Sequence, residues 1–103
     1  RTGAIPMNCE QQFQALLRRV GARDWNEGAE YREAILAEVR DLIAHGEMGV
    51  ALEMLCQYLY EYSVSLRAED LQAIRSMADA MRMPRSTWDV LESAADGRDD
   101  ERY

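Results

Sequence analysis

The stretch EMGVALEMLCQYLYEY, residues 47–62, decides the fold because its apolar residues repeat with the period of an α-helix. At about 100° per residue, eight of its side chains fall in one arc about 160° wide. These are Met48, Ala51, Leu52, Leu55, Cys56, Tyr58, Leu59 and Tyr62. Such a face is wider than one neighbouring helix covers, so we expect this helix to contact several others and to be the most buried element.

The opposite side of the same helix is mixed in character, with Val50 and Met54 among polar residues. Either another helix covers these two side chains, or they form an exposed apolar spot ringed by acids. An apolar or aromatic anchor with a polar surround is typical of interface hot spots, and Tyr60 is the aromatic candidate here. The candidate partner-binding residues are therefore Val50, Glu53, Met54, Gln57, Tyr60, Glu61, Glu69 and Asp70.

Glu69 and Asp70 belong to the next helix, and two interpretations of them stay open. They extend the acidic patch of residues 47–62, or they only stabilise the positive end of their own helix. The fourth helix follows Ser65 or Arg67 and runs to about residue 82.

Two helices are expected before the deciding stretch. The first covers about residues 8–21. The second begins near Asp24, which forms a capping-box pattern with Glu27, or slightly later at Asn26. It ends at His45–Gly46, where a histidine in the last turn precedes a glycine suited to the left-handed C′ position.

The end of the chain favours a fifth, short helix. Pro84 suits its first turn, and the segment carries Trp88 and Leu91 before the pattern fades at Ala95. No alternating strand pattern occurs anywhere in the sequence. The predicted fold is therefore all-α, a single compact bundle of four to five helices.

At 103 residues the chain has room for one core, which we place at residues 7–95. Residues 1–6 precede Met7 and resemble an expression-tag remnant, and the charged residues 96–103 are expected to fray. No apolar run approaches the roughly 18 residues that span a bilayer.

The net charge is −7, from nineteen acidic residues and twelve arginines. Five acids against one arginine lie between residues 47 and 70, so the negative charge is concentrated there. This balance argues against nucleic acid or an anionic membrane as a partner, because both require a basic surface. Two explanations of the acidity stay open: solubility, or a surface complementary to a basic protein.

The residues needed for common catalytic chemistry are missing. His45 is the sole histidine, no lysine occurs, and neither Cys9 nor Cys56 has metal or redox spacing. We interpret His45 as a helix-end residue and Cys56 as a small buried hydrophobe. The sequence thus predicts a non-enzyme with no cofactor, metal or small-molecule substrate, and two free thiols suggest the cytoplasm.

A longer segment carries a family resemblance. The sequence DLIAHGEMGVALEMLCQYLYEY, residues 41–62, resembles the core motif of the MafI family of immunity proteins. That motif has a leucine/isoleucine helix end, a Gly-Glu turn, Ala-Leu-Glu-x-Leu-Cys and a Leu-Tyr-Glu-Tyr end. Val64-Ser65-Leu66 and Met81-Arg82-Met83 are similar too, so the resemblance covers roughly residues 39–83, while Arg67 departs from the small capping residue that is usual there.

The resemblance implies an immunity protein of a polymorphic toxin or contact-dependent growth inhibition system in bacteria. Such a protein binds and neutralises the toxic C-terminal domain of a cognate toxin, often a nuclease, which is usually basic. The alternative is a small acidic helical adaptor or regulatory subunit that binds another bacterial protein. In either case the partner is a protein.

Overall fold

The computed structural model describes residues 9–92 and has the all-α fold predicted from the sequence. The described part contains four α-helices and two short 3-10 helices. In chain order they are α1 (Cys9–Gly21), η1 (Ala29–Tyr31), α2 (Arg32–Ala44), α3 (Met48–Glu61), α4 (Ala68–Ala80) and η2 (Arg85–Thr87). The expectations for residues 1–6 and 96–103 lie outside the described residues.

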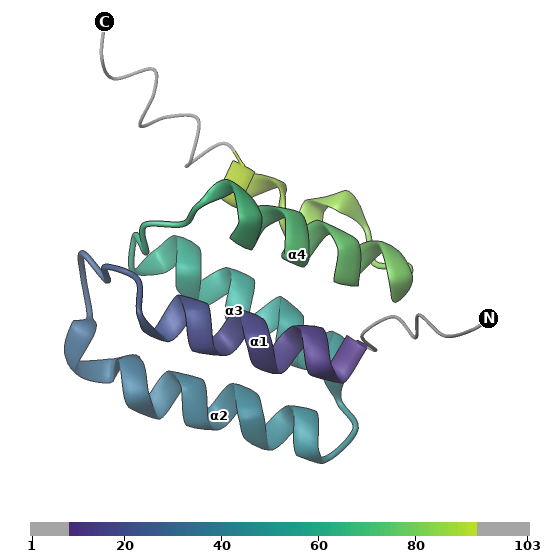
Figure 1. Cartoon of the computed structure of the whole chain (residues 1–103), viewed down its shortest axis with the longest axis horizontal. Helices are drawn as coiled ribbons and strands as arrows, with labels where there is room; N and C mark the ends of the chain where they lie inside the picture. Colours follow the sequence, from purple (N-terminus) through teal and green to yellow (C-terminus); the bar gives the residue numbers. More distant parts are fainter. Residues whose placement is uncertain (1–8, 93–103) are drawn as a thin grey trace, which may run out of the picture.

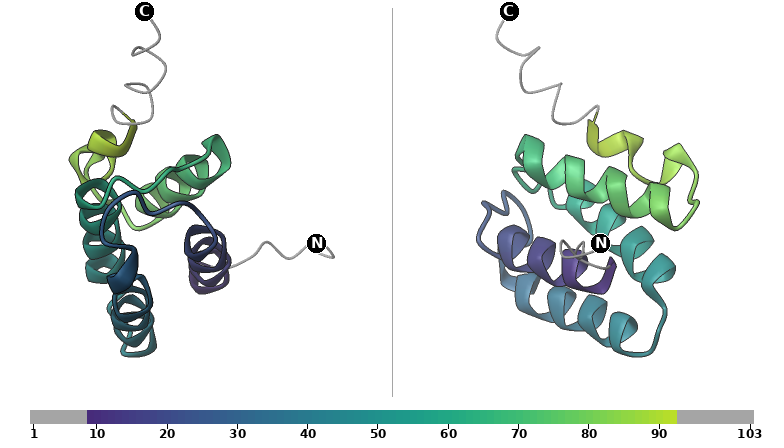
Figure 2. Two further views of the ribbon diagram at one scale, coloured as in Figure 1. Left: turned by 90° about the vertical axis from the view of Figure 1, so that its left-hand side faces the viewer. Right: turned by 45° about the vertical axis from the view of Figure 1, so that its right-hand side comes forward.

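The four α-helices pack in two layers. Helix α2 packs mainly against α3, and α1 mainly against α4 (Figure 1). The end-on view in Figure 2 shows α2 and α3 in one layer, with α1 and α4 beside them in the other. The segment that follows α4 returns to lie next to α3. One side of α3 faces the core of the bundle, and the other is its outer face. No helix within residues 9–92 combines the length and apolar character needed to cross a membrane.

Helix α3 has the orientation that its periodicity predicts. Five residues of the apolar arc are buried, namely Ala51, Leu52, Leu55, Cys56 and Leu59. The other three, Met48, Tyr58 and Tyr62, are half-buried and pack against the same core. No other described helix has as many buried residues, because α3 contacts both its neighbour α2 and the α1–α4 layer.

The end of α2 matches the prediction for His45 and Gly46. The imidazole Nδ1–H of His45 donates to the Asp41 carbonyl oxygen at 2.8 Å, and the His45 backbone N–H donates to the same oxygen at 3.1 Å. The imidazole hydrogen bond, followed by the charge of Asp41, raises the pKa of His45. Gly46 has φ = 78°, the left-handed conformation that ends many helices. His45 is therefore a helix-end residue.

The predicted start of α2 is wrong. Asp24 and Glu27 do not form a capping box, because α2 begins at Arg32 and follows the short helix η1. Residues 24–28 are instead part of the connection between α1 and η1. The α4 start is one of the two predicted: Arg67 precedes it, and the Arg67 N–H donates to Asp70 Oδ2 at 2.9 Å.

The α1–α2 connection is attached to the α3–α4 connection. Trp25 forms an isolated antiparallel bridge with Val64, and the Glu27 N–H donates to the Tyr62 carbonyl oxygen at 3.1 Å. Gly28 has φ = 69°, and a Cβ there would collide with the Tyr62 ring, so glycine is required at this turn. These long-range contacts, absent from any local pattern, explain why the chain between α1 and α2 is not helical.

The predicted fifth helix is shorter than expected. Pro84 precedes the 3-10 helix η2, and α-helical conformation resumes only at residues 89–92. Trp88 and Leu91 are both buried in the core, so they hold this segment against the bundle. The guanidinium carbons of Arg75 and Arg85 lie 5.3 and 5.0 Å from the centre of the Trp88 ring, within cation–π range.

Candidate protein-binding surface

A groove of about 610 Å³ runs between the outer face of α3 and the segment after α4. One wall contains five of the predicted partner-binding residues: Val50, Glu53, Met54, Gln57 and Tyr60. The other wall is made by Pro84, Ser86, Thr87 and Val90. The helical spacing of the first set places them on one face of α3, and the burial of Trp88 and Leu91 fixes the second set opposite.

The groove collects most of the large hydrophobic side chains that the described residues expose. Four such residues occur within residues 9–92, and three of them line the groove: Val50 (45% exposed), Tyr60 (57%) and Val90 (36%). Single exposed hydrophobic residues are ordinary, but a group of them beside polar residues is typical of interaction sites. This grouping makes the groove the candidate protein-binding surface.

Two alternatives were open for Val50 and Met54, namely cover by another helix or exposure within an acidic ring. No described helix covers Val50, and Met54 is only half-buried. Of the nearby acids, Glu53 lines the groove, whereas Glu61 is exposed on α3 but outside the groove lining. The apolar spot is therefore open, with Glu53 as its acidic component.

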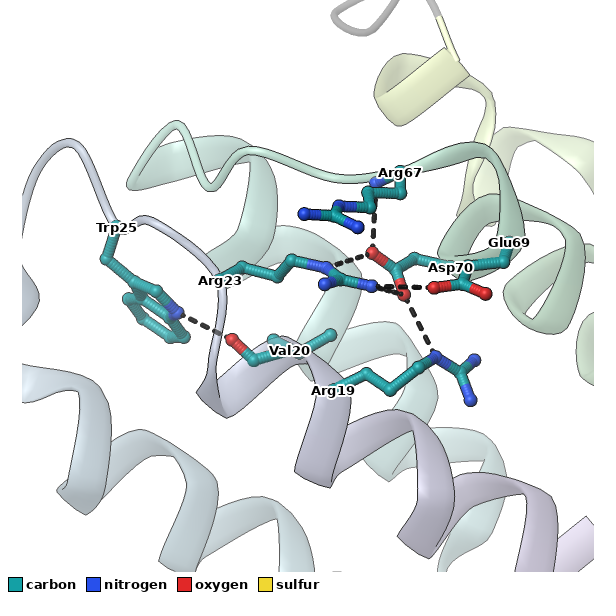
Figure 3. Close-up of polar contacts among 7 residues, drawn as sticks. All are labelled: Arg19, Val20, Arg23, Trp25, Arg67, Glu69 and Asp70. Carbon is teal, nitrogen blue, oxygen red and sulfur yellow. Dashed lines mark hydrogen bonds and ion pairs between the residues drawn. The ribbon is translucent and has the colours of Figure 1, made fainter.

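Glu69 and Asp70 do not continue the groove, and the prediction that Asp70 contacts a partner is wrong. Asp70 is fully buried between α1 and α4 (Figure 3), so it offers no surface to another protein. Glu69 remains exposed but accepts a hydrogen bond from Arg23 Nη2 at 3.1 Å. Both carboxylates therefore interact with Arg23, just after the end of α1, instead of lining the outer face of α3.

Asp70 is the centre of an ion-pair network that joins α1 to α4. Its carboxylate accepts hydrogen bonds from Arg23 Nε at 2.7 Å, Arg23 Nη2 at 3.0 Å and Arg19 Nε at 3.1 Å (Figure 3). Burial acts to raise the pKa of Asp70, but the hydrogen bonds from Arg23, the Arg67 backbone and Arg19 outweigh it and hold the pKa below its ordinary value. Asp70 is thus an ionised structural residue.

Two observations bear on metal binding and thiol chemistry in the part of the chain that the structure describes. Within residues 9–92, no three histidine, cysteine or acidic side chains are grouped so as to hold a metal ion. Cys56 lines one side of the groove but is 2% exposed, and burial, followed by the charge of Glu53, raises the pKa of its thiol to about 12. The thiol is therefore protonated at neutral pH and a weak nucleophile. The groove combines a concave shape and apolar side chains with one carboxylate, an arrangement suited to binding another protein.

Sequence reasoning missed the second wall of the groove. Pro84, Ser86, Thr87 and Val90 lie about 30 residues from the α3 wall along the chain, and their segment was expected to be a regular helix. The available signal was Pro84 directly after a turn, which marks a change of chain direction. Nothing in the sequence states that the chain returns to the outer side of α3.

Comparisons of the chain with protein-family models, with curated proteins and with solved structures give no match.

Proposed function

We propose that this chain is an immunity protein that binds and neutralises the toxic C-terminal domain of a cognate polymorphic or contact-dependent inhibition toxin. The observation that carries the proposal is the groove on α3, in which Val50, Tyr60 and Val90 are exposed together beside Glu53. An aromatic residue beside apolar contacts and a polar rim is the arrangement that interface hot spots favour. In this account the chain acts by binding alone and is not an enzyme.

The resemblance to MafI immunity proteins supports the proposal at the level of sequence. The residues that carry it, 41–62, run from the end of α2 through α3, and so include the α3 wall of the groove. Immunity proteins must distinguish between toxins, and exposed side chains on a fixed helix allow such discrimination without changing the core. The resemblance and the candidate surface therefore concern the same element.

The charge of the chain supports a basic partner. A nuclease toxin is commonly basic because its substrate is a polyanion, and the chain has a net charge of −7. Glu53 and Glu61 are both exposed on α3, where they would attract a basic surface during encounter. The proposal includes a cytoplasmic location for the chain, because a toxin inside the producing cell would be neutralised there.

We expect Tyr60→Ala to weaken binding to the toxin domain by at least about 1 kcal/mol, mainly through faster dissociation. The reason is that Tyr60 is the most exposed large hydrophobic side chain of the groove and would be desolvated on binding. The measurement is surface-binding kinetics of the purified protein with its proposed cognate toxin domain. Tyr60→Phe, which keeps the ring, is the matched control and should stay close to wild type. Equal dissociation rates for all three proteins would exclude Tyr60 from the interface.

We expect the double reversal Glu53→Arg/Glu61→Arg to slow association most strongly at low salt. Screening weakens attraction beyond about 10 Å at 0.1 M salt, so the effect should shrink as salt is added. The control is Glu10→Arg/Glu38→Arg, which changes the net charge equally at exposed positions of α1 and α2. If the two double variants associate at the same rate, only the total charge matters and the α3 face does not steer the encounter.

A further inference from the structure

The fourth exposed large hydrophobic residue, Tyr31, lies outside the groove, in an aromatic cluster. Tyr62 is its centre. The Tyr62 ring stacks with Tyr58 and Trp25, with ring centres 6.0 and 6.2 Å away, and the tilted ring of Tyr31 is also 6.2 Å away. Trp25 is buried and its indole N–H donates to the Val20 carbonyl oxygen at 3.1 Å. The cluster thus extends from the core to the surface, where Tyr31 is 52% exposed.

The cluster is held in place by the backbone around it. Gly28 packs against the Tyr62 ring so closely that a side chain would not fit, and the Tyr31 N–H donates to the Gly28 carbonyl oxygen at 2.8 Å. The Glu27 N–H in turn donates to the Tyr62 carbonyl oxygen. The backbone of Tyr31 is therefore held beside the cluster before any partner arrives, which lowers the entropy cost of binding there.

Three acidic residues adjoin the cluster: Glu30 precedes Tyr31, Glu61 precedes Tyr62, and the Glu27 backbone is bonded to Tyr62. Glu27, Glu30 and Glu61 are all exposed, and none of them has an ion-pair partner among residues 9–92. The charges of Glu61 and Glu30 act on the cluster: burial, followed by Glu61, the neighbouring tyrosines and Glu30, raises the pKa of Tyr62. The arginine next to Tyr31 in sequence, Arg32, lies 3.9 Å from Glu33 through its Nε atom. The three carboxylates are free to interact with an incoming cation.

We propose that this acidic aromatic cluster, formed by Tyr31, Tyr58, Tyr62 and Glu27, Glu30 and Glu61, binds an arginine side chain of a protein partner. A guanidinium group is planar, stacks on aromatic faces and pairs with carboxylates, so it matches both parts of the cluster. The cluster contributes no residue to the groove lining, and its ability to bind arginine does not depend on whether the partner is a toxin.

The test is an NMR titration of the full chain with a capped Gly-Arg-Gly-Arg-Gly peptide, compared with the same peptide carrying citrulline in place of arginine. Citrulline has nearly the same shape as arginine but no charge. We expect the arginine peptide to shift the ring signals of Tyr31 and Tyr62, and the citrulline peptide to shift them much less. Equal shifts with both peptides, or shifts from the arginine peptide confined to the groove, would overturn the proposal.

Matched variants distinguish the contribution of the aromatic rings to peptide binding from that of the carboxylates. Tyr31→Leu should weaken peptide binding about two- to fivefold, the size expected for loss of one exposed cation–π contact, whereas Tyr31→Phe should not. Tyr60→Leu, which changes a similarly exposed tyrosine in the groove, should bind the peptide as wild type does. If Tyr31→Leu does not fold, the triple change Glu27→Gln/Glu30→Gln/Glu61→Gln provides the second test and should also weaken binding. Unchanged binding in the folded variants would contradict the proposal.

Discussion

Asp70→Ala is expected to lower the free energy of unfolding by about 3 kcal/mol, the lower end of the range for removing one partner of a buried ion pair. Asp70 is fully buried, and its loss would leave Arg23, whose side chain is only 12% exposed, without its main acceptor. Arg19 is 34% exposed and can turn to solvent, so the upper end of the range is not expected. The measurement is urea denaturation followed by circular dichroism.

Glu69→Ala is the matched control for this change. Glu69 interacts with the same guanidinium group of Arg23, but its side chain is 60% exposed. An exposed ion pair contributes less than about 1 kcal/mol, so this variant should remain close to wild type. If Asp70→Ala costs no more than Glu69→Ala, the network that joins α1 to α4 does not stabilise the fold.

The same network predicts a pH dependence. The pKa of Asp70 is lower in the folded protein than in the unfolded chain, so its contribution to stability is complete above about pH 4, the ordinary pKa of aspartate. That contribution is lost as the pH falls through the folded-state pKa, because the carboxylate is then protonated. Asp70→Asn should therefore lose less stability than wild type on acidification below pH 4.

Leu55→Ala is expected to lower the free energy of unfolding by about 2–5 kcal/mol, through lost burial and the cavity left behind. Leu55 is completely buried on the side of α3 that faces the core. Gln57→Ala, at an exposed position two residues further along the same helix, should change stability by no more than about 0.5 kcal/mol. The measurement is again urea denaturation. A cost below about 1 kcal/mol for Leu55→Ala would mean that this site can collapse around the missing atoms or does not belong to the core.

The orientation of α3 could be predicted because it depends on local periodicity alone. A helix with eight apolar residues in one arc has one way to face a core, and the same arithmetic placed Val50, Met54 and Tyr60 on the outer side. The end of α2 could also be predicted from the local sequence, because His45 and Gly46 act within one turn of their own helix.

The features that were missed depend on residues far apart in the sequence. Asp24 and Glu27 have the spacing of a helix cap, but contacts with the α3–α4 connection, nearly 40 residues away, keep this segment out of helix. Asp70 lies in the first turn of α4, where an acid is favourable whether it faces water or an arginine. Its partners Arg19 and Arg23 are 51 and 47 residues away, so the sequence left the choice open.

The groove combines one wall that local sequence predicts with one that depends on distant parts of the chain. Its α3 wall follows from helical spacing, whereas the wall around Pro84 and Val90 exists only because the chain returns across α3 after α4. Burial of Trp88 explains why that segment stays in place once it has returned. A sequence pattern describes each wall separately but does not state that they face one another.

The proposed immunity function is tested by co-expression with a candidate cognate toxin domain, with bacterial growth as the readout. We predict that the wild-type chain restores growth and co-purifies with the toxin domain. The variant Glu53→Arg/Tyr60→Ala/Glu61→Arg, present at the same level, should do neither. Growth arrest by an active toxin domain despite abundant, folded wild-type chain would contradict the immunity function and favour the role of an adaptor.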